Sequence, residues 1–152
     1  MRKIAVFIVL CITIFSFGRQ LTVFYLNDEL YPVSVTYECE NEDVVVFLFE
    51  KMSNPPEGLT TFVPVDVLKA YFIVEKSLVI DLCKSQLAVL DFQMERYFVH
   101  QVLITLFTNF SGIDSVYFLV DGRKRDVLAN YVDIRYGFPR QIWTEWPVRG
   151  KE

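Results

Sequence analysis

The chain has 152 residues, which suffices for one domain and leaves no room for two ordinary hydrophobic cores. Hydrophobic residues make up 53% of the chain, and its formal net charge is −4. Binding to nucleic acid or to anionic lipid relies on clustered excess cations, so the acidic balance argues against both as general partners.

Residues 1–18 have the layout of an export signal. Arg2 and Lys3 precede an uncharged, largely apolar run at positions 4–17, which is shorter than the roughly 20 residues of a comfortable membrane span. Gly18 supplies a small residue for cleavage. We expect a signal peptide or an uncleaved anchor, with a buried strand or helix as the remaining alternative. The protein is then extracytoplasmic (secreted, periplasmic or membrane-anchored), and it meets the membrane only if the N-terminal segment is uncleaved.

Two strands and a helix are predicted next. Residues 21–26 are rich in β-branched and aromatic side chains, and residues 32–38 alternate between apolar and polar, so we expect an antiparallel pair. The following run contains three consecutive valines, which favour a strand, but the cap and acids at positions 41–43 favour a helix N-terminus. One helical face would carry Val45, Leu48, Phe49 and Met52. We predict a helix that ends at Asn54-Pro55-Pro56.

A hairpin and a long helix follow. The runs LKAYFIVE and SLVIDL flank Lys76 and predict a tight β-hairpin over about residues 68–82. The strongest helical signal in the chain comes after it, as a continuous apolar stripe at helical spacing that stops before Ser111-Gly112. The stripe consists of Val99, Val102, Leu103, Leu106, Phe107 and Phe110. The polar residues Gln101, Thr105 and Asn109 fall mostly away from it.

The last predicted elements complete an α+β domain over residues 19–138. Residues 116–120 lack alternation, as expected of a central or doubly covered strand. Asp121-Gly122 predicts a hairpin turn with positive φ at both central positions, and residues 127–135 are expected to form the last strand. The order β-β-α-β-β-α-β-β describes two helices packed on one face of a mainly antiparallel sheet. Residues 139–152 look like an irregular C-terminal tail.

Several short motifs, taken in order, resemble the GerMN domain family of sporulation and spore-germination proteins. They are LTVFYL, Pro55-Pro56 with Gly58-Leu59, Ile80-Asp81-Leu82-Cys83, Thr105-Leu106, and Val116 to Gly122. The resemblance covers about residues 21–138; Cys83 stands where the family has serine, and the chain carries one domain copy. It implies a fold similar to ring-building motifs, the small modules that stack side by side in envelope-spanning assemblies. It also implies no established catalytic site.

The candidates for chemistry are few. His100, the only histidine, flanks the apolar stripe, and a packed structural histidine is favoured because Ser/His/Asp or Cys/His catalysis would depend on it alone. Cys39, Cys83 and His100 show no zinc-binding spacing. The acids at predicted strand ends are Asp81, Asp114, Asp121 and Asp133. A pair of them would suit acid–base work or a cation, but turn formation is the commoner role. We predict no enzyme, no metal site and no cofactor.

Two features remain as a candidate contact surface. Arg123-Lys124-Arg125 reverses the acidic background; a solvated turn that protects a strand edge is favoured, and a docking patch for an acidic partner is the alternative. Trp143 and Trp146 in the tail either fold back onto the core or anchor a partner.

Cys39 and Cys83 remain once residues 1–18 are removed. In an exported protein they can form a disulfide, and two buried thiols are equally compatible with the sequence.

These observations predict an exported, non-enzymatic GerMN-like module that works by protein–protein contact at the cell envelope, either by self-association or with an envelope partner. A role in sporulation or germination rests on the family analogy. The alternative is an envelope domain that binds a small ligand or a cell-wall polysaccharide on an aromatic-rich sheet.

Overall fold

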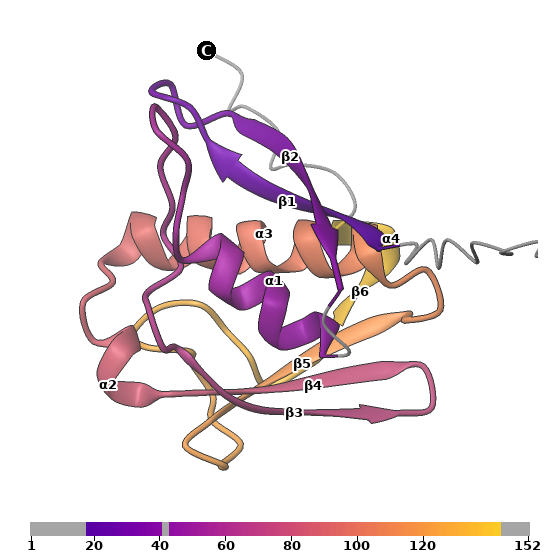
Figure 1. Cartoon of the computed structure of the whole chain (residues 1–152). Helices are drawn as coiled ribbons and strands as arrows, with labels where there is room; N and C mark the ends of the chain where they lie inside the picture. The colour runs from indigo at the N-terminus through magenta and orange to yellow at the C-terminus, as the bar shows by residue number, and fades with distance from the viewer. Residues whose placement is uncertain (1–17, 41–42, 144–152) are drawn as a thin grey trace, which may run out of the picture.

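The computed structural model describes residues 18–40 and 43–143, so the predicted signal segment lies outside the described residues. Two β-sheets lie on either side of a layer of helices (Figure 1). One sheet is a hairpin of β1 (Arg19–Leu26) and β2 (Pro32–Cys39), and the other has four strands in the order β3-β4-β5-β6. Helices α1 (Val44–Met52) and α3 (Phe92–Asn109) fill the space between them.

The α+β class is confirmed, and the described strand pairs are antiparallel except for β4 with β5. The single sheet that we expected is wrong, because β1 and β2 form a sheet of their own. The physical reason, given below, is that side chains of α3 occupy the edge of β1 where a further strand would have to pair.

The β1–β2 hairpin has the predicted antiparallel pairing, with Val23 opposite Val35. Its inner face buries Leu21, Val23 and Tyr25 against the helices. The Tyr25 hydroxyl donates to the carbonyl of Lys51 at 2.7 Å, which ties the hairpin to the end of α1. The N-terminal sheet is therefore anchored by both packing and a buried hydroxyl.

Helix α1 forms where the sequence was open to two interpretations. The Asp43 carboxylate caps the helix by accepting from the Val46 N–H at 3.1 Å. The buried residues are Val45, Leu48, Phe49 and Met52, the predicted face. The cap and this apolar face outweigh the strand preference of three valines.

The four-stranded sheet contains the predicted hairpin. Strands β3 (Leu68–Val74) and β4 (Ser77–Leu82) pair across a turn in which Glu75 has a φ of 53°. Strand β5 (Ser115–Val120) runs parallel to β4, which requires the long crossover through the short helix α2 (Lys84–Leu87) and α3. With β6 (Phe138–Pro139) on its other side, β5 is central, as predicted.

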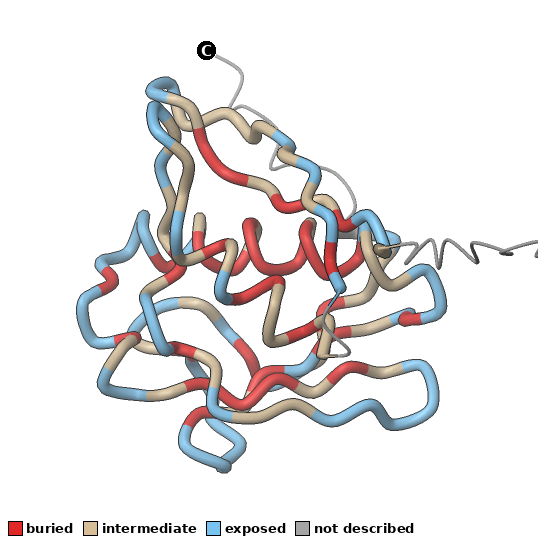
Figure 2. The backbone as a smooth tube through the Cα atoms, viewed as in Figure 1, coloured by how far each residue is buried: buried red, intermediate tan, exposed pale blue. Residues whose placement is uncertain are grey.

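Helix α3 supplies much of the core, whose buried residues stand out in Figure 2. The predicted stripe is buried from Val99 to Phe107. Gln101 and Thr105 are also completely buried, so the polar side of this helix is not a solvent face. The helix thus packs against a sheet on each side.

The polar residues of α3 close the edge of β1. Asn109 donates to the carbonyl of Thr22 at 2.7 Å and accepts from its N–H at 2.9 Å. One turn earlier, Thr105 accepts from the N–H of Phe24 at 3.2 Å, and Gln101 donates to the carbonyl of Phe24 at 2.9 Å. These side chains take the place of a neighbouring strand.

The predicted strand over residues 127–135 is wrong. This segment is a loop with one isolated bridge, between Val127 and Asp133. The carboxylate of Glu95, which is fully buried in α3, accepts from the backbone N–H groups of Ala129, Asn130, Tyr131 and Val132. Successive N–H groups that converge on one carboxylate cannot alternate as a strand requires.

The predicted irregular tail begins with ordered structure. Pro139 belongs to β6, and Arg140 opens the short helix α4 (Arg140–Trp143). The Arg140 guanidinium donates to the carbonyls of Phe107 at 2.8 Å and Ile113 at 2.6 Å, and also to that of Phe110. A cation placed on the last carbonyls of α3 complements the negative end of the helix dipole.

Candidate functional site

The Asp121-Gly122 pair is a tight turn, as predicted. Asp121 has a φ of 50° and Gly122 a φ of 70°. The Val120 N–H donates to the Arg123 carbonyl at 3.0 Å, and the reverse bond is 3.2 Å. The antiparallel pairing is limited to this one bridge between Val120 and Arg123. The turn therefore reverses the direction of the chain but does not start a second strand.

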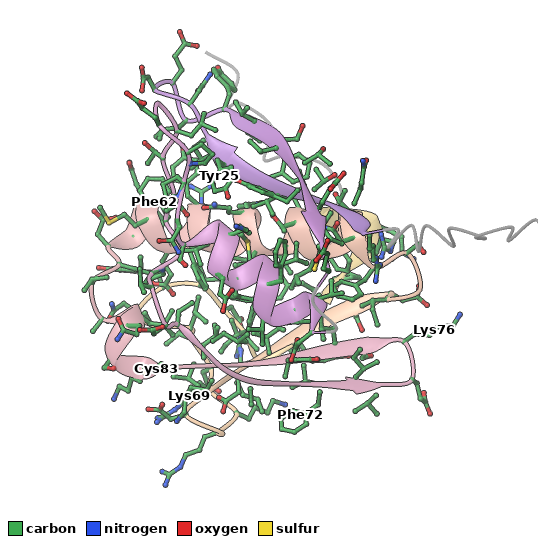
Figure 3. The ribbon with its side chains drawn as sticks, in the orientation of Figure 1. Tyr25, Phe62, Lys69, Phe72, Lys76 and Cys83 are labelled. Atoms are coloured by element: carbon green, nitrogen blue, oxygen red, sulfur yellow. The ribbon has the colours of Figure 1, made fainter. Side chains whose placement is uncertain are left out.

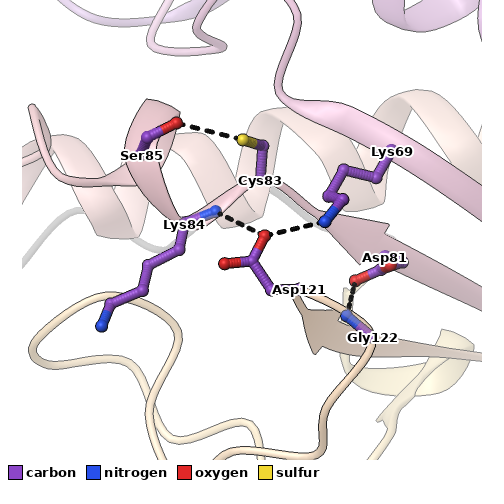
Figure 4. A network of polar contacts seen from close by, with 7 residues as sticks. All are labelled: Lys69, Asp81, Cys83, Lys84, Ser85, Asp121 and Gly122. Atoms are coloured by element: carbon purple, nitrogen blue, oxygen red, sulfur yellow. Dashed lines mark hydrogen bonds and ion pairs between the residues drawn. The ribbon is translucent and has the colours of Figure 1, made fainter.

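A polar network fixes this turn against β3 and β4 (Figure 4). The Asp121 carboxylate accepts from the Lys69 ammonium at 3.0 Å and from the Lys84 backbone N–H at 3.4 Å. The bond from Lys69 lowers the pKa of Asp121 below its ordinary value. Asp81 accepts from the Gly122 N–H at 2.7 Å. Asp81 and Asp121 together fix the Asp121-Gly122 turn against β3 and β4.

Cys83 lies beside this network (Figure 4). Its sulfur is 3.1 Å from the Ser85 hydroxyl, and that hydrogen bond, with a second from the Gln86 N–H, lowers the pKa of the thiol. Cys39 is buried at the end of β2, in the other sheet, and no disulfide joins these two cysteines in the structure. Of the two alternatives for the cysteine pair, the structure shows thiols, of which only Cys39 is buried.

The remaining acids also lie in local ion pairs. Asp114 is 3.6 Å from the Lys76 ammonium, at the end of the β3–β4 hairpin. Asp133 pairs with Arg135, which lowers the pKa of Asp133 to about 2. Neither acid is brought together with Asp81 or Asp121 by these contacts.

His100 is partly buried in α3 beside a cavity of about 290 Å³ lined by Phe92, Arg96 and Tyr131. Burial, followed by the nearby Arg96 cation, lowers the pKa of His100 to about 4. The imidazole is therefore neutral at neutral pH and a weak base, as a structural histidine would be.

The basic triplet borders a cavity of about 570 Å³. Lys124 and Arg125 line it together with Lys84 from α2, and one acid, Asp126, joins them. Buried Leu87 and Leu128 contribute its apolar lining. The side chains of Lys84, Lys124 and Arg125, which line the cavity, form no ion pair with the described residues. The sequence singled out the triplet but did not place it beside Lys84.

The tryptophans are placed only in part. Trp143 is the last residue of α4, and Trp146 lies outside the described residues. Their role as a contact surface stays a prediction.

The outer face of the four-stranded sheet is open and apolar. Both α1 and α3 lie on the other side of this sheet (Figure 1). A row of side chains crosses the open face, because Phe72 pairs with Val79 and Val79 with Tyr117. Phe72 is 54% exposed and points away from the helix layer (Figure 3), and Tyr117 is 42% exposed. Val74, which is 58% exposed, extends the patch along β3.

Sequence reasoning predicted the hairpin and raised an aromatic-rich sheet as a possible binding platform, but it did not locate an open apolar face on β3, β4 and β5. The available signal was the uninterrupted apolar run from Ala70 to Val74, which places apolar side chains on both faces of β3 although a helix covers only one.

Within residues 18–40 and 43–143, no group of three or more His, Cys, Asp or Glu residues is arranged to hold a metal ion. None of the helices in those ranges is both long and apolar enough to span a membrane.

The fold and its surfaces define a class: a small α+β module whose distinctive described features are an open sheet face and a basic cavity. Over residues 22–126, the chain matches the family model described as Germane: sporulation and spore germination. The chain belongs to this family, and the resemblance to GerMN domains is confirmed.

Solved structures agree on the fold. The tandem GerMN domains of the sporulation protein GerM from Bacillus subtilis superpose with a TM-score of 0.71 at 18% identity, covering 82% of this chain and 47% of that one. The chain thus spans about half the length of the tandem structure. The first GerMN domain of the same protein gives a TM-score of 0.61 at 18% identity, with 81% and 98% covered.

A candidate lipoprotein from Clostridium perfringens has the same fold, with a TM-score of 0.55 at 18% identity and coverage of 82% and 89%. None of the curated proteins matches the chain.

Proposed function

We propose that this chain is a non-enzymatic, extracytoplasmic module that acts in sporulation or spore germination by binding other proteins. The observation that carries the proposal is the open sheet face. Phe72, Val74 and Tyr117 expose large apolar side chains on one contiguous surface, which in a soluble module favours a partner-binding role. Aromatic side chains of this kind are common anchors of protein interfaces.

Two further observations support this assignment. The apolar run at positions 4–17 suits export, and the related structures include a sporulation protein and a candidate lipoprotein. Asp81 and Asp121, the acids brought together at the turn, bond to backbone and to Lys69, which suits a structural role.

Chemical cross-linking in intact sporulating cells tests the proposal. The full chain should give an adduct with an envelope protein or with itself, and Tyr117→Glu should remove it by placing a charge in the contact. Val89→Glu is the matched control, because Val89 is 71% exposed and lies away from the sheet, between α2 and α3. An adduct that survives Tyr117→Glu unchanged contradicts the proposal.

A second candidate function is favoured by the basic cavity. Three cations over an apolar lining suit a small ligand that carries both an anionic and an apolar part, such as a phosphorylated or carboxylated cell-wall fragment. A thermal-shift screen of such fragments tests it, since a ligand of the folded state raises the melting temperature. The shift should be lost in Lys124→Glu; a shift that this variant retains would locate the ligand elsewhere.

A further inference from the structure

Strand β3 is an unprotected sheet edge. Among the described strands it pairs only with β4, and its last three residues, Phe72, Ile73 and Val74, are each more than half exposed. An exposed, apolar edge strand is a template for pairing with another chain.

The two edges of the β1–β2 sheet are closed or blunted. The edge of β1 is occupied by polar side chains of α3, as described above. Strand β2 exposes Ser34, Thr36 and Glu38, polar residues that discourage pairing with another strand. Only β3 combines an open edge with exposed apolar side chains among these three strands.

The backbone direction of β3 follows from its neighbours. The carbonyl of Lys76 accepts from the N–H of Asp114, and the carbonyl of Leu82 accepts from the N–H of Asp121, so both point toward β5. Backbone groups alternate in direction along a strand, so the N–H and C=O groups of even-numbered β4 residues point toward β5 and those of odd-numbered residues point toward β3. Their partners Val74, Phe72 and Ala70 therefore bond to β4. The N–H and C=O groups of Tyr71 and Ile73 point the other way, to the open edge.

We propose that two copies of this chain pair antiparallel through β3, centred on Phe72. In this register the outward-pointing backbone N–H and C=O groups of Tyr71 in one copy bond to those of Ile73 in the other. The same pairing occurs a second time with the two copies exchanged. Phe72 lies opposite Phe72 of the second copy. The proposal rests on the protein-binding function above and names a second copy as the partner.

Charge complementarity selects this register. Lys69 and Glu75 lie three residues to either side of Phe72, Lys69 at the bulge near the start of β3 and Glu75 in the turn after it, so antiparallel pairing brings Lys69 of each copy toward Glu75 of the other. The Lys69 ammonium bonds to Asp121 of its own chain at 3.0 Å, so it would share its charge between Asp121 and Glu75 of the second copy. Both side chains are exposed. Shifting the centre to Tyr71 or Ile73 also satisfies backbone groups but places Lys69 or Glu75 opposite an uncharged residue.

The pairing joins the two four-stranded sheets into one. The apolar rows of Phe72, Val79 and Tyr117 then form a single surface across both copies. Burial of the exposed β3 residues supplies the driving force.

Disulfide trapping on the full chain tests both the pairing and its register. In a background of Cys11→Ser and Cys83→Ser, we expect Phe72→Cys to form a covalent dimer under mild oxidation, because directly opposite residues lie within disulfide range. Tyr71→Cys and Ile73→Cys should each remain monomeric. Thr36→Cys, on the exposed polar edge of β2, is the matched control.

Each outcome is informative. A dimer from Tyr71→Cys or Ile73→Cys in place of Phe72→Cys rejects the register, and equal trapping at Thr36→Cys rejects a specific edge. Trapping of Phe72→Cys only onto a different protein rejects a second copy as the occupant. Melting curves of the variants exclude unfolding as the reason for a negative result.

Charge reversal gives an independent readout in the Phe72→Cys protein. Glu75→Lys should lower the initial rate of dimer trapping about fivefold, since it sets like charges opposite each other twice. Adding Lys69→Glu should restore it. Lys69→Glu alone, which also breaks the bond to Asp121, is the control for that loss and should lower the rate as Glu75→Lys does. A double variant that melts like the Phe72→Cys protein and still traps slowly rejects the register. If the Phe72→Cys protein stays monomeric while the chain with native Phe72 still gives its Tyr117-dependent adduct, the dimer is rejected and the proposed function stands. If the chain with native Phe72 gives no such adduct either, both are rejected.

Discussion

Glu95 offers the sharpest test of how this fold is held together. Its carboxylate is fully buried in α3 and accepts from four successive backbone N–H groups, of residues 129–132, at 3.0 to 3.2 Å for the shortest bond of each. The change Glu95→Ala removes every one of these acceptors while leaving the donors on the loop.

The expected loss of unfolding free energy is about 3–5 kcal/mol. A hydrogen bond to a charged group contributes about 1.5–3 kcal/mol, but the four bonds share one carboxylate and the released loop can bind water, so they do not add. Removal of one partner from a buried ionic contact costs a similar 3–5 kcal/mol. Alanine favours the helix more than glutamate does, so helix propensity opposes this loss.

Urea unfolding followed by circular dichroism measures the effect. Glu95→Gln should lose about 2–3 kcal/mol, because one acceptor oxygen remains while the new NH₂ group faces other donors. Glu50→Ala is the matched control, since Glu50 is exposed on α1, and its effect should stay within about 0.5 kcal/mol. A Glu95→Ala protein within about 1 kcal/mol of the unmodified chain would refute the reasoning.

Three further outcomes are expected. Asn109→Ala should lower the unfolding free energy by about 1–3 kcal/mol, because it leaves two backbone groups of β1 without their partner. Arg135→Gln should raise the pKa of Asp133 from about 2 toward its ordinary value, as followed by carboxyl NMR. The depressed pKa adds stability above about pH 4 that is lost as the pH falls toward 2, so this variant should lose that acid dependence. Cys83 should be alkylated faster than buried Cys39, as measured by peptide mass spectrometry, since its thiol is more accessible and its pKa is lowered.

Each of these outcomes has a control. Thr108→Ala, on the exposed side of α3, should leave stability nearly unchanged, and an equal loss there would contradict the role of Asn109. An unchanged Asp133 titration in Arg135→Gln would remove the ion pair as the cause of its low pKa. Ser85→Ala should slow alkylation of Cys83, and no change would show that the hydroxyl does not stabilise the thiolate.

Apolar periodicity predicted the parts of the fold that apolar burial determines. The stripe of α3 and the inward face of α1 are both buried as expected, because each helix packs where its apolar residues recur. The Asp121-Gly122 turn was also predictable, since positive φ at two successive positions has a strong local signature.

The parts that failed depend on polar side chains whose partners are distant in sequence. Gln101, Thr105 and Asn109 have the spacing of a solvent face, and only the presence of β1 makes them a buried ladder. Glu95 likewise gives no local sign that it binds a loop more than thirty residues later. A single sequence records the spacing of such groups but not their partners.

The polar ladder on α3 also has a consequence for the order in which the fold can be completed. Its hydrogen bonds to Thr22 and Phe24 join residues 77 to 87 positions apart. During synthesis, the β1–β2 hairpin emerges long before the helix that closes its edge, and an isolated two-stranded hairpin is marginally stable in water. The β1–β2 hairpin is therefore made before α3 but becomes stable only after α3 has been synthesised and has closed its edge.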